Sequence, residues 1–388
     1  MGIGARFAVA VGVAAVSVAA EAQEIAVSGL GRVRATFGEP FSSVRALREE
    51  ADGRVLVIDD IENRILRVDL REGTATVIRR QGNGPGEYTL PVGLLALAAD
   101  TTLAVDLTGG GRALLIVARG ASSDRLAARG IAPGAPLFYR PDVQADARGN
   151  LYELVMLTAP EDRAGGHSGI RRLDRASGRQ DTIGRVSQQG RSPLLRPMPT
   201  TSTANTAPRA AGPPPPYATT DQWAVAADGR VAIVTVDPYR VVFIDPSGGR
   251  VEGPVLPYRP VPMSAGLKAE WRVRQEQPVL SLRMNEDRTM SPGRSRRTYV
   301  EPTAWPDVLP PFLQRALRFA PDGMLWIERA VEAGAGQGFD VIDARGRLVR
   351  HVRLDAGLRL VGFGRDGVYT VRRDADDLEY LQLHHLQP

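Results

Sequence analysis

The feature that most constrains this chain is an internal repeat. A turn containing Asp-Gly is followed by an alternating apolar strand, a loop, a second strand, another glycine turn and a third strand. The first copy is the clearest, because Asp52-Gly53 leads into RVLVIDD (54–60), RILRVDL (64–70) and TATVIRR (74–80). Alternation with period two gives each strand one core-facing side. One such sheet cannot bury both of its faces, so neighbouring copies must cover each other.

The spacing of the copies predicts how many there are. Their first turns fall near residues 53, 101, 149, 229, 323 and 367. Most steps are roughly 44–48 residues, which is typical of a four-stranded propeller blade. The two longer steps predict insertions at about 187–220 and 257–315. The sequence therefore predicts an all-β fold, a six-bladed β-propeller with four-stranded blades.

The last copy is incomplete, since the chain reaches Pro388 after about three strands. The segment GRVRATFG (31–38) precedes the first copy and resembles an outer strand such as TATVIRR. We predict that this N-terminal strand completes the last blade and closes the ring. Closure would remove an exposed strand edge, which is a frequent aggregation hazard.

The first 22 residues predict export. Arg6 precedes an apolar stretch from Phe7 to Ala20, and Ala20-Glu21-Ala22 matches a signal-peptidase site. An uncleaved membrane anchor is the alternative. We expect residues 1–22 to be a signal peptide and residues 23–388 to be one propeller domain, without a transmembrane helix in the mature chain. The absence of cysteine fits a periplasmic or secreted bacterial protein, and we expect a monomer.

The charge pattern argues against nucleic-acid binding. The formal net charge is +5, with acidic residues interspersed among the arginines along the whole chain. Nucleic-acid binding needs a clustered basic surface. We therefore expect no nucleic-acid partner.

Two stretches carry a resemblance to a known family. The phrase ADGRVLVIDDIENRILRVDL (51–70), followed by RRQGNGPGEY (79–88), resembles the NHL-like six-bladed propellers of exported bacterial proteins. The segment WPDVLPPFLQRALRFAPDGMLWIE (305–328) is similar to members of the same family. The resemblance covers about residues 31–388 and implies the architecture. It implies no single reaction, because related propellers include protein- or RNA-binding NHL domains and lactonases of the regucalcin and gluconolactonase type.

Both insertions fall in connections that share one face of such a propeller. We expect this face to carry function, because loops on a rigid scaffold usually do. Side chains from several blades would converge there over the central channel, the acids binding a cation or basic group, the arginines an anion and the tyrosines offering stacking area. The predicted ligand-binding residues are Asp59, Asp60, Asn63, Arg80, Glu87, Tyr88, Asp106, Asp237, Tyr239, Arg240 and Glu328.

No catalytic motif stands out. The GNGPGE loop lacks the Lys-Ser/Thr of a phosphate-binding loop. We therefore predict a binding module that recognises a peptide, a glycan or an envelope partner through the loop-rich face, and whether it also catalyses a reaction stays open. The alternative is a metal-dependent hydrolase or lactonase-like enzyme at the central channel, which would use a divalent cation such as Ca²⁺. Otherwise we expect no cofactor.

Overall fold

The computed structural model describes residues 25–79, 81–82, 87–98, 100–106, 113–117, 143–188, 215–277, 279–284, 290–296 and 298–386. The predicted signal peptide lies outside these residues, as does most of the predicted insertion 187–220. Within them the chain is mostly β, with several four-stranded antiparallel sheets. This agrees with the predicted all-β class.

The larger sheets are numbered here in chain order. The first strand of each is the one nearest the centre, namely β3, β7, β10, β14, β20 and β24. Sheet 1 contains β3 (Val44–Glu49), β4 (Val55–Asp59), β5 (Arg64–Asp69) and β6 (Thr74–Arg79). Sheet 2 contains β7 (Pro91–Ala98), β8 (Thr101–Asp106) and β9 (Ala113–Val117). Sheet 3 contains β10 (Gln144–Ala145), β11 (Leu151–Met156), β12 (His167–Leu173) and β13 (Gln180–Ser187).

The C-terminal half continues this order. Sheet 4 contains β14 (Gln222–Val225), β15 (Val231–Thr235), β16 (Arg240–Ile244) and β17 (Arg250–Glu252). Sheet 5 contains β20 (Phe312–Phe319), β21 (Leu325–Arg329), β22 (Gly338–Ile342) and β23 (Leu348–Arg353), with β1 (Val27–Ser28) parallel to β23. Sheet 6 contains β24 (Leu358–Gly364), β25 (Gly367–Arg373), β26 (Glu379–His385) and β2 (Val33–Thr36).

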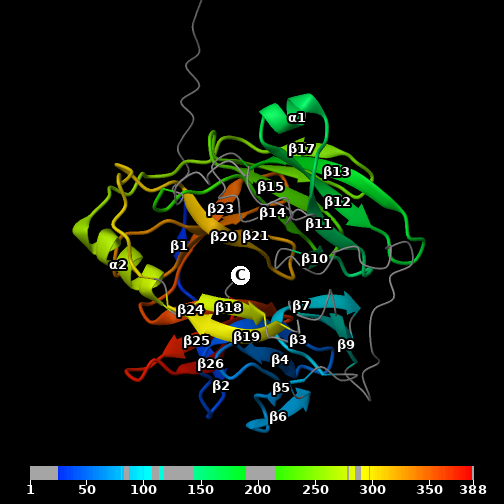
Figure 1. Cartoon of the computed structure of the whole chain (residues 1–388), viewed down its shortest axis with the longest axis vertical. Coiled ribbons are helices and arrows are strands. Elements are labelled where there is room, and N and C mark those ends of the chain that lie inside the picture. The colour runs from blue at the N-terminus through cyan, green and yellow to red at the C-terminus, as the bar shows by residue number, and fades with distance from the viewer. Residues whose placement is uncertain are drawn as a thin grey trace, which may run out of the picture.

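The sheets are arranged around a common centre (Figure 1). Contacts join their first strands in series, with β24 against β3, β3 against β7, β7 against β10, β10 against β14 and β14 against β20. Apolar side chains fill the spaces between neighbouring sheets, as in the cluster that joins sheets 4 and 5 through Val241 and Leu325. Radial antiparallel sheets that pack face to face are the arrangement of a β-propeller.

The Asp-Gly turns have the geometry that the repeat requires. The Asp52 carboxylate accepts the N–H of Arg54 at 3.1 Å, and Asp228 does the same with Arg230 at 2.9 Å. Gly53, which lies between Asp52 and Arg54, has φ of +87°, a backbone conformation that residues with a Cβ rarely adopt. The repeated dipeptide therefore specifies the tight connection between the first and second strands.

The N-terminal strand β2 pairs antiparallel with β26, so the two ends of the chain share one sheet. The Gly31 N–H donates to the His385 carbonyl at 3.1 Å, and a Cβ at Gly31 would lie 2.7 Å from that same oxygen. Phe37 and Phe41, which follow β2, are buried in the cluster between sheets 6 and 1. This segment therefore supplies buried core side chains as well as a strand of sheet 6.

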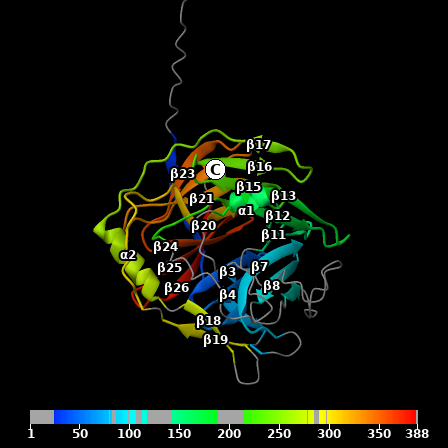
Figure 2. The same cartoon turned by 45° about the horizontal axis from the view of Figure 1, so that its top comes forward.

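The insertion between β17 and β20 contains α2 (Ala265–Glu276) and the hairpin of β18 (Val279–Met284) and β19 (Met290–Ser295). The Ser264 hydroxyl caps the helix α2 by accepting the Leu267 N–H at 3.2 Å. A short helix α1 (Pro160–Ala164) joins β11 to β12 and lies over sheet 3 (Figure 2). Among the described residues, no helix is long and apolar enough to cross a membrane.

Candidate functional site

One face of the molecule, here called the loop face, carries the connections between second and third strands and the segments that enter the first strands. The short helix α1 belongs to it because it joins β11 to β12. The helix α2 packs Leu267 and Trp271 against Tyr217, which precedes β14. The β18–β19 hairpin reaches it through Arg294, whose guanidinium donates to the Asp60 carbonyl at 2.8 Å. The described insertions therefore lie on one face.

Two predicted acids, Asp59 and Asp106, are structural rather than exposed. The Asp59 side chain is 0% exposed at the end of β4, and it accepts the backbone N–H groups of Ser42 at 3.2 Å and Ser43 at 3.1 Å. Asp106 ends β8 and accepts the N–H groups of the two residues before β7, at 2.8 and 2.9 Å. Each carboxylate thus fixes the entry of a first strand. This corrects the prediction that they would face a ligand.

Asp59 and its neighbour Asp60 make a matched pair for a stability test. Asp59→Ala leaves two backbone donors without their acceptor, and we expect a loss of about 2–3 kcal/mol in the free energy of unfolding. Asp60→Ala removes partly exposed ion pairs and is expected to cost no more than about 1 kcal/mol. Urea denaturation of both variants measures the difference. Equal losses would show that Asp59 does not hold the entering strand.

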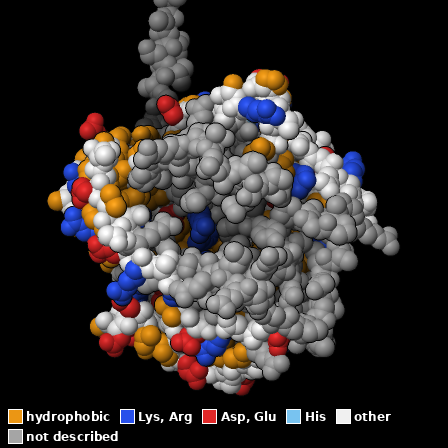
Figure 3. All heavy atoms as spheres, viewed as in Figure 1, with side chains coloured by type: hydrophobic (Ala, Val, Ile, Leu, Met, Phe, Trp, Pro, Cys, Tyr) orange, Lys and Arg blue, Asp and Glu red, His pale blue; other side chains and the backbone are white. Residues whose placement is uncertain are grey.

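A pocket of about 290 Å³ at the seam of sheets 1 and 6, here called the arginine pocket, is lined by Arg45, Arg359 and Arg373 beside Asp60 and Glu379. Arg45 and Arg294 both pair with Asp60. The buried Glu379 pairs with Arg359 at 2.7 Å and Arg373 at 3.4 Å, and also accepts the N–H of Val44 at 2.6 Å. Each carboxylate of the arginine pocket therefore pairs with two guanidinium groups, and Arg373 also pairs with Asp377 at 3.6 Å. Basic side chains are also visible at the hollow in the middle of the loop face (Figure 3).

The first-blade residues Tyr88 and Asn63 also have internal roles. Tyr88 is 1% exposed, its hydroxyl accepts the Ile65 N–H at 3.0 Å, and burial raises the pKa of the phenol. It therefore cannot offer the predicted stacking surface. The Asn63 amide donates to the Thr89 carbonyl at 2.8 Å and ties two loops together. Arg80 lies outside the described residues.

The remaining predicted residues do not meet at one point. Arg240 pairs with Glu252 in β17, at the outer edge of sheet 4. Glu328 accepts the Gln337 amide at 2.7 Å within sheet 5. Glu87 lies beside the turn at residue 82, where a Cβ would contact its carboxylate. The predicted convergence of all these groups over the channel is not what their contacts show.

Two predicted residues, Asp237 and Tyr239, do line a common hollow. It is a groove of about 710 Å³ between sheets 4 and 5, here called the proline–tyrosine groove. Apolar side chains gather on the side of the loop face where α2 lies (Figure 3). The groove is lined by Pro215, Pro216, Tyr217, Ala218, Thr219, Val236, Asp237, Pro238, Tyr239, Val255, Leu256, Tyr258, Pro306, Val308, Leu309, Pro310 and Pro311.

A buried network fixes Tyr239 in the wall of this groove. Its hydroxyl donates to Asp340 at 2.9 Å, and the same carboxylate lies 2.7 Å from Nδ1 of His351. Burial, together with Asp340, raises the pKa of Tyr239 well above its usual value. Tyr239 is 3% exposed and meets Tyr258 edge to face at 6.2 Å, while Tyr258 is 43% exposed. The stacking surface predicted for Tyr239 therefore belongs to Tyr258.

The groove is mostly apolar, and polar groups in its lining form internal hydrogen bonds. The Tyr217 hydroxyl is satisfied internally, since it donates to the Leu267 carbonyl at 2.6 Å. Thr219 lies within 3.4 Å of the amides of Gln222 and Gln314. Asp237 is exposed, and it forms no ion pair with any residue that the structure describes. The groove thus offers apolar surface with one free carboxylate.

The sequence patterns missed Tyr258 and the prolines at 306, 310 and 311. These residues lie at both ends of the predicted insertion 257–315, and no periodicity marks them. The available signal was their composition, because prolines and aromatic residues recur where the insertion leaves and rejoins the sheets. Only the packing of sheets 4 and 5 brings the two ends together.

The described side chains do not assemble a metal centre. Within these parts of the chain, no three His, Asp or Glu residues are grouped so that they could hold an ion. Asp59 and Asp106 are already hydrogen-bonded to backbone N–H groups, and Asp60 is shared by two guanidinium groups. These three acids are therefore committed to other contacts.

Comparison with known proteins finds distant structural similarity. No protein-family model matches the sequence, and no curated protein matches it. The calcium-binding protein regucalcin from Agrobacterium tumefaciens is 12% identical, with a TM-score of 0.41, over 93% of this chain and 97% of that chain. A gluconolactonase from Xanthomonas campestris is 11% identical, with a TM-score of 0.39, over 92% of this chain and 97% of that chain. Virginiamycin B lyase from Staphylococcus aureus is 11% identical, with a TM-score of 0.38, over 92% of this chain and 99% of that chain. At such identities none of these activities transfers to this chain.

Proposed function

We propose that this chain is an exported, six-bladed propeller that binds an extended, proline-containing peptide of a partner protein in the proline–tyrosine groove. In this proposal residues 1–22 direct export to the periplasm or the medium, and β2 closes the ring as the outer strand of the last blade. The mature protein is a monomer. The observation that carries the proposal is the exposed apolar groove, which holds an unpaired carboxylate between two rigid sheets.

The chemistry of the groove favours a peptide over a glycan. Proline-rich segments dock into aromatic-lined grooves with little loss of conformational entropy, because their extended conformation is already formed. Val255, Tyr258 and Val308 expose apolar surface here, at 56%, 43% and 42%. A sugar would instead need many polar partners, whereas Tyr217 and Tyr239 use their hydroxyls internally. The lining therefore suits proline and aliphatic side chains.

The free Asp237 carboxylate adds a charge preference. It is exposed on the loop between β15 and β16 and lies beside the apolar wall of the groove. An arginine or lysine next to the prolines would pair with it, and such a pair at the rim contributes mainly to selectivity. The proposed ligand is a proline-containing peptide with one basic residue.

A panel of short synthetic peptides tests the proposal. Wild-type protein should bind a proline- and arginine-containing peptide saturably, and Tyr258→Ala should weaken binding about tenfold or more, since exposed aromatic anchors often dominate interfaces. Asp237→Asn should weaken binding of this peptide but not of a version in which glutamine replaces arginine. Isothermal titration calorimetry measures each affinity.

Val349→Ala is a matched control, because Val349 is 42% exposed on β23, outside the groove. It should bind like wild type. If Tyr258→Ala and Val349→Ala both retain wild-type affinity, the groove is not the binding site.

The metal-dependent hydrolase or lactonase-like reading predicts a different result. It requires stoichiometric Ca²⁺ or Zn²⁺ that survives dialysis of the purified protein, and a lactone substrate that is turned over only with that ion. The binding proposal predicts peptide affinity that a chelator leaves unchanged. Elemental analysis together with titration in the presence of a chelator separates the two.

A further inference from the structure

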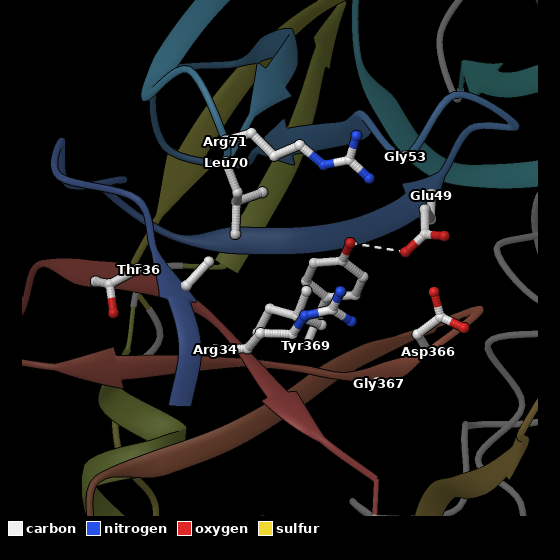
Figure 4. A pocket seen from close by; sticks show the side chains of 11 residues that line it. Arg34, Thr36, Glu49, Gly53, Leu70, Arg71, Asp366, Gly367 and Tyr369 are labelled. Atoms are coloured by element: carbon white, nitrogen blue, oxygen red, sulfur yellow. Dashed lines mark hydrogen bonds between the residues drawn. The ribbon is translucent and has the colours of Figure 1, made fainter. Parts of the chain in front are cut away.

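A second pocket lies on the face opposite the loop face, where the chain ends meet. It has a volume of about 450 Å³, within the range of small-molecule sites. Its walls come from β2, from the turns that follow β3 and β5, and from the start of β25 (Figure 4). Sheets 6 and 1 therefore build it together.

Two exposed arginines line this pocket. Arg34 on β2 and Arg71 after β5 lie on either side of the Tyr369 hydroxyl (Figure 4). That hydroxyl donates to Glu49 at 2.7 Å. Burial raises the pKa of Tyr369, while Arg34 and Arg71 both act in the opposite direction, as cations close to the hydroxyl do. The Arg71 guanidinium also lies 3.4 Å from the point where a Cβ on Gly53 would stand.

The nearby arginine Arg67 differs from these two. It pairs with Glu50 at 2.6 Å in the same sheet as Arg71. Arg34 and Arg71 have no ion pair with any part of the chain that the structure describes. Glu49 forms no ion pair with either arginine, and its carboxylate accepts the Tyr369 hydroxyl and the N–H of Arg365.

The pocket is also lined by a second carboxylate, that of Asp366, and by apolar side chains. Asp366 is exposed, as Arg34 and Arg71 are, so water screens all three charges. Ala35, Leu70 and Leu383 line the pocket with apolar surface, beside the ring of the buried Tyr369. The site therefore combines two unpaired cations with an apolar wall.

We infer that this pocket binds a small oxyanion carried on an apolar body, such as an organic carboxylate or a phosphate monoester, with Arg34 and Arg71 on the oxyanion. Planar guanidinium groups suit both anions, since each presents two oxygens to a pair of N–H donors. The apolar part of the ligand lies against Leu70, Ala35 and Leu383. The pocket is separate from the proline–tyrosine groove, so either assignment can fail without the other.

Titration with four defined probes tests this inference. Phenyl phosphate and benzoate carry an apolar ring, whereas inorganic phosphate and acetate do not. At least one ring-bearing probe should bind saturably and more tightly than its matched small anion, and the comparison of the two ring probes identifies the preferred oxyanion. Arg34→Gln and Arg71→Gln should each weaken binding about tenfold or more, and the double variant should lose saturable binding.

Arg32→Gln is the matched control, because Arg32 is an exposed arginine on the same N-terminal segment that does not line the pocket. It should leave the affinity unchanged, and heteronuclear NMR should place the probe-induced shifts at β2 and β25. The inference is overturned if no probe binds saturably. It is also overturned if Arg32→Gln weakens binding as much as the pocket variants, which would indicate diffuse charge attraction.

Discussion

Deletion of residues 25–38 should abolish the cooperative fold and drive the protein into aggregates. The deletion removes β2, the antiparallel partner of β26, and exposes that strand's edge to other molecules. It also removes Phe37, which is 1% exposed among Tyr369, Val371 and Leu381. Loss of one such phenylalanine alone costs about 3–5 kcal/mol, against a total stability of about 5–15 kcal/mol for a typical protein.

Size-exclusion chromatography and thermal unfolding measure this outcome. A shorter deletion of 25–29 is the control, since it removes β1 and its two-residue pairing with β23 but keeps β2 and Phe37. The shorter variant should stay monomeric and lose only a few degrees in Tm. A 25–38 deletion that remains monomeric with a wild-type Tm would contradict closure of the ring by the N-terminal strand.

Glu379→Ala should be the most destabilising single substitution among the acids of the arginine pocket. Glu379 is 1% exposed, receives Arg359 and Arg373, and accepts the N–H of Val44 at 2.6 Å. It thereby joins the start of β26 in sheet 6 to the start of β3 in sheet 1. Removing one partner of a buried ion pair typically costs about 3–5 kcal/mol, and the partial exposure of Arg359 places the expectation near the lower end.

Asp377→Ala is the control for this substitution. Asp377 is 85% exposed and pairs with Arg373 at 3.6 Å, so its loss should cost less than about 1 kcal/mol. Urea unfolding should show a lower midpoint for Glu379→Ala at an unchanged slope. Similar midpoints for the two variants would mean that Glu379 does not link the two sheets.

Much of the fold was predictable because its signals are local. The turn at Asp52-Gly53 and the alternation in 54–60 are set by neighbouring residues, and β3 and β4 follow from them. The helix over 265–276 was predictable for the same reason, since Ser264 caps it and Pro278 follows it. Such patterns need no knowledge of the rest of the chain.

The candidate site was much less predictable, because it depends on tertiary contacts. Asp59 and Asp60 are adjacent in sequence, yet one is buried against backbone N–H groups and the other pairs with Arg294 of the distant hairpin. Tyr88 and Tyr258 are equally plausible stacking residues by type, but only Tyr258 is exposed. Which member of such a pair faces solvent is decided by packing between sheets, and no local pattern encodes it.

Photo-crosslinking can show where the peptide binds in a protein that carries no substitution. A proline- and arginine-containing peptide with one benzophenone side chain would be irradiated with the wild-type protein, and the modified residues identified by mass spectrometry. We expect crosslinks in 215–219, 236–239, 255–258 and 306–311, suppressed by unlabelled peptide. Suppressible crosslinks at the arginine pocket or on the opposite face, with none in these four segments, would contradict the proposed site.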